Sequence, residues 1–163
     1  MLQYIDKYLP FVEFLSYLSV IAGAVFIAIQ IWQQRKNSRW EHDRQRKQST
    51  IEFYNTISSQ SQAFIDTLEN MNRNGKVINY KLVNANRKTW ESVTWYLSRL
   101  ERLAVGVATD IFDFDILNRI AGKYLSRIYS QLNEYIKEAR IFENSPERYK
   151  EFEFMVNRII KTP

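Results

Sequence analysis

The chain contains no cysteine, one histidine, four glycines and three prolines among its 163 residues. The lack of cysteine excludes disulfides and thiolate metal sites. The single histidine, His42, excludes a metal site with two histidines from one chain and disfavours a Ser-His-Asp triad. Neither of the glycine-rich phosphate-binding motifs, GxGxxG and GxxxxGK(S/T), is present. The scarcity of glycine and proline indicates long helices joined by few turns.

Charge is absent from one long stretch, the 19 residues from Phe14 to Trp32 with the sequence FLSYLSVIAGAVFIAIQIW. At about 1.5 Å per helical residue it spans about 28 Å, close to the ~30 Å hydrocarbon core of a bilayer. We therefore predict one transmembrane helix. The predicted organisation is a tail and transmembrane helix over residues 1–32, a basic juxtamembrane segment over residues 33–47 and a helical bundle over residues 48–163. A signal peptide cleaved near Ala22-Gly23-Ala24 and a buried core helix stay open as alternatives.

The formal net charge of +5 is concentrated after the apolar stretch. Residues 33–50 hold six cations against Glu41 and Asp43, whereas residues 1–32 carry a net charge of −1. The cations are Arg35, Lys36, Arg39, Arg44, Arg46 and Lys47. Lys and Arg beside a membrane helix favour the cytoplasmic side. We expect a single-pass membrane protein, with its N-terminus outside, its C-terminal domain in the cytoplasm and Trp32 at the inner interface.

Small and polar residues of the predicted membrane helix gather on one side. At about 100° per residue, five of them fall within about 60° of one another and are named here the polar stripe: Ser16, Ser19, Gly23, Gln30 and Gln34. Large apolar residues cover the opposite side: Phe14, Leu18, Ile21, Val25 and Ile29. Such a stripe is typical of an interface between membrane helices, and with one span per chain the partner must be another chain. The stripe predicts a homo-oligomer interface or the lining of a pore; a plain anchor is the third interpretation.

The basic segment from Arg35 to Lys47 has three interpretations. In the first, it contacts the membrane surface and fixes the orientation of the chain. In the second, its copies in a ring of chains surround the cytoplasmic mouth of a pore. In the third, it binds RNA, with Trp40 as a stacking surface.

The rest of the chain has helical spacing, with no strand pattern and no internal repeat. The membrane helix is predicted to continue through residues 33–72, to be followed by a turn at Asn72–Gly75 and then by a loop with a short helix over residues 76–86. Further helices are predicted from about Lys88 to Ala108, from Ile116 to Ile136 and from Ser145-Pro146-Glu147 onward. The fold class is therefore all-α, a transmembrane helix followed by a bundle of four or five helices. The predicted core residues of the last three helices are Trp90, Val93, Leu97, Leu100 and Ala104; Ile116, Ile120, Tyr124, Ile128, Leu132 and Ile136; and Phe152, Met155, Val156 and Ile159.

Two groups of residues have the composition of a chemical site. Asp110, Asp113 and Asp115 resemble a metal cluster, but their place between two predicted helices favours turn residues and a cap at Asp113 or Asp115. Arg35 and His42 have an R-x6-H spacing that resembles the R-x4–6-H motif of HEPN-type ribonucleases, in which the histidine works on the RNA 2′-hydroxyl. Basic residues crowd this segment for topological reasons, so the spacing is weak evidence for catalysis. We therefore predict no enzyme, no metal and no cofactor, and keep a ribonuclease as an alternative.

The second half of the chain resembles a family of small bacterial proteins with an N-terminal membrane helix and a helical domain of unassigned function. The matching pattern is Leu97, Glu101, Ala104, Gly106, Asp113, Arg127, Tyr129, Ile136, Arg140 and Phe152. The architecture is also similar to the accessory membrane proteins of type VI-B CRISPR systems, a family described as divergent HEPN-like and pore-forming. That resemblance implies a partner, an RNA-guided RNA-cleaving nuclease, and a role for the polar stripe in the pore.

The expected function is accordingly a homo-oligomeric inner-membrane pore that acts as an accessory effector in CRISPR-linked antiviral defence. A membrane-tethered HEPN-like ribonuclease and a tether that recruits a defence nuclease are the alternatives. The expected partners are other copies of the chain, the lipid bilayer and the nuclease, with RNA binding by the basic segment as a weaker expectation. Subunit number, gating signal and ion selectivity do not follow from the sequence.

Overall fold

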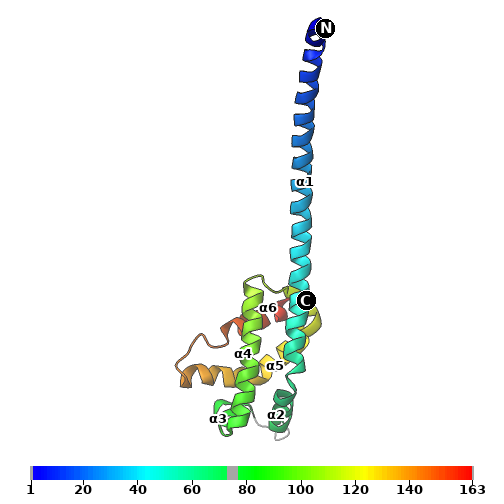
Figure 1. Cartoon of the computed structure of the whole chain (residues 1–163). Coiled ribbons are helices and arrows are strands. Elements are labelled where there is room, and N and C mark those ends of the chain that lie inside the picture. Colours follow the sequence, from blue (N-terminus) through cyan, green and yellow to red (C-terminus); the bar gives the residue numbers. More distant parts are fainter. Residues whose placement is uncertain (1, 73–76, 163) are drawn as a thin grey trace. The chain divides into compact units, whose positions relative to one another are not determined.

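A computed structural model describes residues 2–72 and 77–162, and the side chains of residues 14–71 and 77–162. The described residues contain six helices and no strand, so the all-α prediction is confirmed. The helices are α1 (Leu2–Ser59), α2 (Gln62–Asn72), α3 (Tyr80–Asn84), α4 (Arg87–Ala108), α5 (Phe114–Phe142) and α6 (Lys150–Lys161) (Figure 1). The chain divides into two compact units, one ending at Arg44 and one beginning at Gln45.

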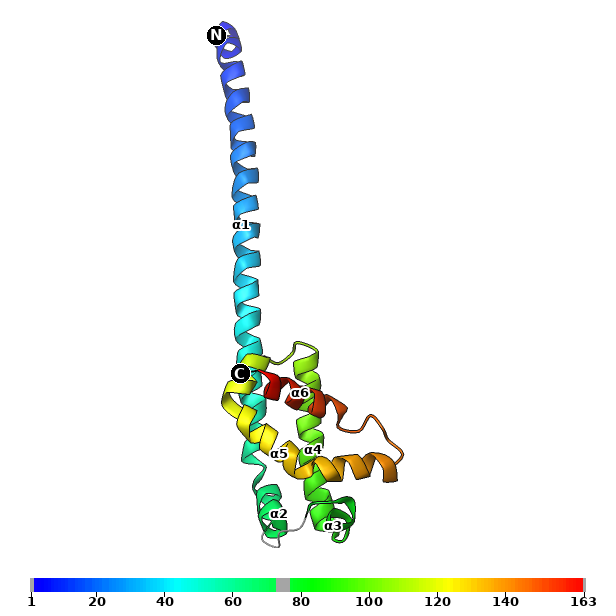
Figure 2. The ribbon, with the colours of Figure 1, turned by 180° about the vertical axis from the view of Figure 1, so that it is seen from behind.

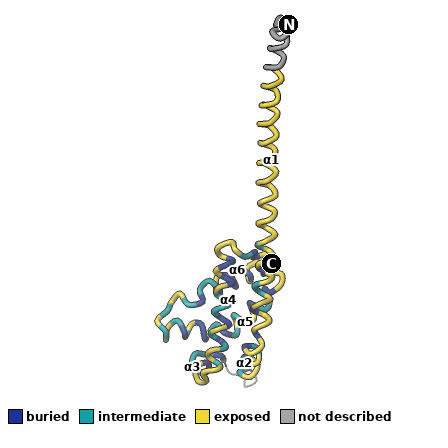
Figure 3. The backbone as a smooth tube through the Cα atoms, in the orientation of Figure 1, coloured by how far each residue is buried: buried dark blue, intermediate teal, exposed yellow. Residues whose placement is uncertain are grey.

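The described residues of the first unit form the part of α1 that ends at Arg44. Every described side chain from Phe14 to Arg44 is exposed, which Figure 3 displays as an unbroken exposed stretch of α1. This is the one helix among the described residues that is long and apolar enough to cross a membrane. None of its most apolar window is buried.

Helix α1 continues past the apolar stretch, as predicted, but it ends earlier than the spacing indicated. It stops at Ser59, and α2 begins at Gln62. Hydroxyl groups concentrate at this break: Ser59 Oγ donates to the Thr56 carbonyl at 3.0 Å and Ser61 Oγ donates to the Ser58 carbonyl at 2.6 Å. Serine hydroxyls that bond nearby carbonyls offer the backbone an alternative to the helical ladder, so a helix can end without glycine or proline.

The second unit is a bundle built by the last turns of α1 and by α2 to α6. Helix α4 lies at its centre and contacts α2, α3 and α6, while α5 contacts α3 and α6 (Figure 2). The largest fully buried side chains include Phe64 of α2, Tyr96 of α4, Tyr135 of α5 and Phe152 of α6. Phe64 and Tyr96 stack with ring centroids 3.9 Å apart. The predicted short helix is α3, whereas the turn predicted at Asn72–Gly75 lies largely outside the described residues.

The predicted core is right for α6 and partly wrong for α4 and α5. All four predicted residues of α6 are buried, whereas Trp90 in the first turn of α4 is 37% exposed. In α5, the predicted line of four-residue steps is wrong at its start, since Ile120 is 45% exposed and Leu117 and Ala121 are buried instead. Each four-residue step turns about 40° around a helix, so a strict line of such steps drifts off one face. The core follows alternating steps of three and four residues.

Helix α6 begins at Lys150 rather than at the predicted Ser145-Pro146-Glu147 start. Residues 146–149 form turns, and Tyr149 precedes the helix with a positive φ of 57° and no side-chain cap. The cap comes from another helix: the Glu101 carboxylate of α4 accepts from the backbone N–H groups of Glu151 (3.1 Å) and Phe152 (2.8 Å). A helix N-terminus favours a carboxylate because its first N–H groups have no partner within the helix. A tertiary contact therefore decides where α6 starts.

Candidate functional site

The polar stripe lies on α1 within the first unit, and all five of its residues are exposed. Ser19 Oγ donates to the Ser16 carbonyl at 2.8 Å, so its hydroxyl proton is satisfied within its own helix. A Cβ built on Gly23 would meet nothing within 4 Å. The stripe is thus a smooth, shallow surface in its middle, with the longer amides of Gln30 and Gln34 towards one end.

The opposite face of the same helix is large and apolar. Its five residues, Phe14, Leu18, Ile21, Val25 and Ile29, are between 48% and 64% exposed. An exposed apolar surface of this length marks a contact with lipid or with other protein. The first unit is consequently a helix with two chemically different faces, neither of which is covered.

The basic residues that follow divide between the two units. Arg35, Lys36, Arg39 and Arg44 are exposed in the first unit. The first three of these, together with Trp32 and Trp40, line a surface hollow of about 430 Å³. Lys47 is exposed in the second unit, whereas Arg46 is half-buried and its guanidinium is bonded to Asp113 within the bundle. The lipid or pore-mouth contact predicted for the six cations stays a prediction.

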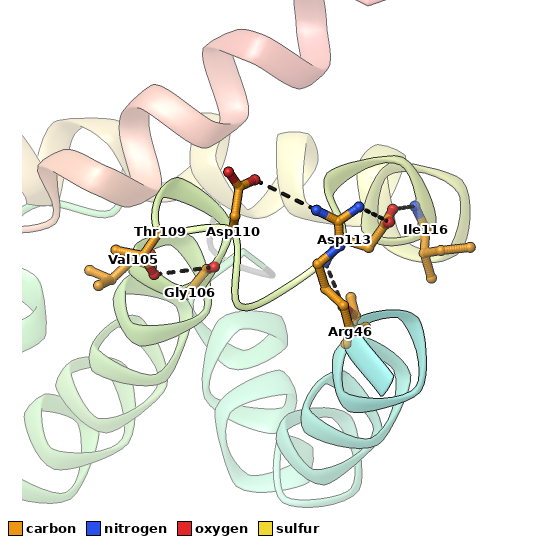
Figure 4. A network of polar contacts seen from close by, with 8 residues as sticks. Arg46, Val105, Gly106, Thr109, Asp110, Asp113 and Ile116 are labelled. Atoms are coloured by element: carbon orange, nitrogen blue, oxygen red, sulfur yellow. Dashed lines mark hydrogen bonds and ion pairs between the residues drawn. The ribbon is translucent and has the colours of Figure 1, made fainter. Parts of the chain in front are cut away.

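Arg46 joins α1 to the turn between α4 and α5. Its Nη2 donates to Asp113 Oδ2 at 3.0 Å, and Nη1 lies 3.7 Å from Asp110 Oδ1 (Figure 4). Asp113 Oδ1 accepts from the Ile116 backbone N–H at 3.0 Å and caps α5. The backbone N–H of Asp113 donates to Thr50 Oγ1 at 2.7 Å, and that hydroxyl donates to the Arg46 carbonyl at 2.8 Å. We name Arg46, Thr50 and Asp113 the α1 joint.

The three aspartates therefore act as turn, cap and first-turn residues. The sequence predicted a cap at Asp113 or Asp115, and Asp113 is that cap; Asp110 occupies a turn position with a positive φ of 58°. Asp115 lies exposed in the first turn of α5. Within the described part of the chain, no group of three or more His, Cys, Asp or Glu side chains is arranged to hold a metal ion. The sequence did not point to Thr50, whose only signal was its place four residues after Arg46 on one helix face.

Arg35 and His42 both lie exposed on α1. They are seven residues apart, which places them on one side of the helix and about 10 Å apart along its axis. The ribonuclease alternative requires this pair to meet a second copy of the motif, and catalysis by the pair stays an untested alternative.

Residues of the recognised pattern mostly hold the bundle together. Leu97, Ala104, Ile136 and Phe152 belong to the core. Gly106 accepts from the N–H groups of Ile111 and Phe112 at 2.9 Å each, and a Cβ there would lie 2.2 Å from the Phe112 ring. Glycine is needed because the turn folds back onto α4 at this point.

Two charged residues of the pattern fasten the ends of α5 and α6. Arg140 Nε donates to the Arg148 carbonyl at 2.8 Å, and its Nη2 lies 2.7 Å from Glu153 Oε2. Burial, followed by the hydrogen bond to Glu153, raises the pKa of Tyr129 to about 12. Burial also raises the pKa of the Glu101 carboxyl above its ordinary value, although the two N–H groups that it accepts act in the opposite direction. Arg140, Tyr129 and Glu101 each interact with groups of another part of the bundle, as structural residues do.

A family model described as a domain of unknown function, DUF4760, matches residues 18–159. The match covers most of the chain. The chain belongs to the DUF4760 family. Neither a curated protein nor a solved structure matches it. The DUF4760 match runs from residue 18 of the exposed helix α1 through most of α6, so it covers the bundle and most of the apolar stretch.

We predict that Asp113→Ala destabilises the DUF4760 bundle far more than Asp115→Ala. The first change removes the cap of α5 and leaves the Arg46 guanidinium only its longer contact with the exposed Asp110, at a cost of about 2–3 kcal/mol. The second removes an exposed carboxylate from a helix first turn, at a cost of under about 1 kcal/mol. Urea unfolding of the full chain in mild detergent, followed by far-UV circular dichroism, measures both. Equal losses in the two variants, or a loss of stability on adding EDTA, would instead indicate a metal site.

Proposed function

We propose that this DUF4760 protein is a single-pass membrane protein whose membrane helices assemble, with the polar stripe inward, into a homo-oligomeric pore that perturbs the inner membrane. The single observation that supports this proposal is the exposed first unit, a helix with an apolar face and a polar face. The C-terminal bundle lies in the cytoplasm in this proposal, because the basic segment follows the span.

Membrane insertion is supported by the exposure of the apolar stretch and by the length of α1. A core helix would be covered by its own chain, whereas none of the apolar window is buried. A signal peptide cleaved after Ala24 would leave the apolar residues from Val25 to Trp32 exposed at the start of the mature protein. Lipid around the helix removes this apolar surface from water.

Assembly is supported by the stripe. Lipid gives no benefit for exposing serine or glutamine, and the described residues of one chain supply one candidate span. The open surface at Gly23 permits close approach of a second helix, and hydrogen bonds between polar side chains of membrane helices contribute about 0.6 kcal/mol each on average. A wet lumen is the alternative way to satisfy the Gln30 and Gln34 amides. A ring of helices provides both kinds of partner, because neighbouring helices contact each other and water fills the centre.

The first prediction concerns subunit number. Light scattering in mild detergent, with detergent mass subtracted, should give a discrete assembly of several chains. Gly23→Leu should reduce that assembly, because a large side chain on the stripe keeps two helices apart. Ala28→Leu is the matched control, since it adds similar bulk on the opposite face and should leave the mass unchanged. A monomeric wild-type protein would contradict the proposal and favour the tether.

The second prediction concerns the lumen. Full-length protein in planar bilayers should conduct ions, and the triple change of Ser16, Ser19 and Gln30 to Leu should reduce conductance at least tenfold, because leucine dewets a narrow pore. The control changes, Ile21→Leu and Val25→Leu, lie on the apolar face and should leave the conductance at the wild-type level. Conductance that survives the triple change would show that the stripe does not line the pore.

We further propose that the pore acts in antiviral defence beside an RNA-guided RNA-cleaving nuclease. The support is the resemblance of the sequence and architecture to the CRISPR accessory family. In this setting, opening of the pore dissipates ion gradients and arrests the infected cell. The bundle holds the ring together and receives the signal that opens it.

Phage plating tests this setting. Cells that carry a phage-targeting type VI-B nuclease together with this chain should plate an RNA-targeted phage at least tenfold less efficiently than cells with the nuclease alone. The stripe variant with three leucines should lose that benefit. His42→Ala should retain it, whereas a loss with His42→Ala alone would favour the ribonuclease alternative. An unrelated span that replaces residues 11–32 without loss would favour the tether.

A further inference from the structure

The hollow that follows the span is built from two indoles and three cations. Trp32, Arg35, Lys36, Arg39 and Trp40 line it on one helix surface within the first unit. The two indoles are 65% and 70% exposed, and Lys36 Nζ lies 5.7 Å from the centre of the Trp32 ring. Eight residues separate the indoles, which is about 12 Å along the helix. No carboxylate lines the hollow; Asp43 lies one turn beyond Arg39.

This combination of groups matches an amphiphile at the boundary of a bilayer. Tryptophan is enriched at the headgroup level, where one part of its ring is in apolar surroundings and the other is wet. Lys and Arg beside it attract the phosphate of anionic lipids. A soluble phosphate would satisfy the cations but not the exposed indoles, which adjoin the apolar face that ends at Trp32.

The position of the hollow around the helix decides whether its cations contact the surrounding lipid or ring the mouth of the pore. At about 100° per residue, its lining residues centre about 160° from the middle of the polar stripe. If the stripe faces the centre of an assembly, the hollow faces away from it. The three cations then lie against the surrounding lipid and do not ring the mouth of the pore.

We propose that this hollow is a binding site for the phosphate headgroup of an anionic phospholipid. The inference rests on the proposed function for its outward orientation. Arg35, Lys36 and Arg39 bind the phosphate, and Trp32 and Trp40 contact the glycerol and the upper acyl chains on either side. The site selects phosphatidylglycerol over phosphatidylcholine, because the net charge of the first headgroup is negative and that of the second is zero.

Native mass spectrometry of the full chain, released from maltoside micelles with titrated lipid, counts subunits and bound lipids in one spectrum. Wild-type protein should retain phosphatidylglycerol at least tenfold more strongly than phosphatidylcholine. Changing Arg35, Lys36 and Arg39 together to Gln should abolish that preference. The control with the same charge change is Lys81, Lys88 and Lys123 to Gln, which lie exposed on α3, α4 and α5 and should leave it intact.

A second variant, Trp32→Leu with Trp40→Leu, retains the cations and should weaken phosphatidylglycerol binding several-fold. Excess glycerol 3-phosphate should not displace the lipid. A preference that survives the Arg35, Lys36 and Arg39 changes would overturn the proposal. Binding of a uridine 20-mer that depends on the same cations, without lipid preference, would overturn it in favour of RNA.

The same spectra distinguish the two proposals. Monomers that select phosphatidylglycerol through the three cations would uphold the lipid site and contradict the pore. Assemblies that show no lipid preference would contradict the lipid site and leave the pore proposal standing.

Discussion

The bundle depends on one nearly buried carboxylate, Asp113. Its side chain caps α5 and pairs with Arg46, and its backbone N–H donates to Thr50. A carboxylate this far from water is stable only when its partners satisfy it, so the turn after α4, the start of α5 and the last turns of α1 are fixed together. The α1 joint thereby sets which face of the last turns of α1 packs on the core.

The recognised sequence pattern follows the same logic elsewhere in the bundle. Glu101 supplies the cap that α6 lacks locally, and Arg140 connects the end of α5 to the residues around the start of α6. Glu101 and Arg140 thus bond to backbone and side-chain groups distant in sequence, as scaffold residues do. The largest exposed apolar surface and the polar stripe both lie on α1.

The exposed surface of α1 has two chemically different faces. Lipid or other protein would remove the apolar face from water, and a second helix or water would bond the Gln30 and Gln34 amides. In the proposed assembly, the apolar face is outward and the stripe inward. The hollow between Trp32 and Trp40 extends this division past the apolar stretch, because the helix period places its lining residues on the side of the apolar face.

The sequence by itself determined the features that depend on local composition and period. These are the all-α class, the uncharged stretch that ends at Trp32, the stripe, a cap at Asp113 or Asp115 and the core face of α6. Tertiary structure decided the rest, because partners distant in sequence compete with local signals. Ser145-Pro146-Glu147 is a good local helix start, yet Glu101 binds N–H groups farther along and α6 starts at Lys150. Arg46 belongs to a basic run, yet its guanidinium is bonded to Asp113, which lies 67 residues away in sequence. Residue period gives the face of a helix, but only packing tells which side chains a distant carboxylate or guanidinium will satisfy.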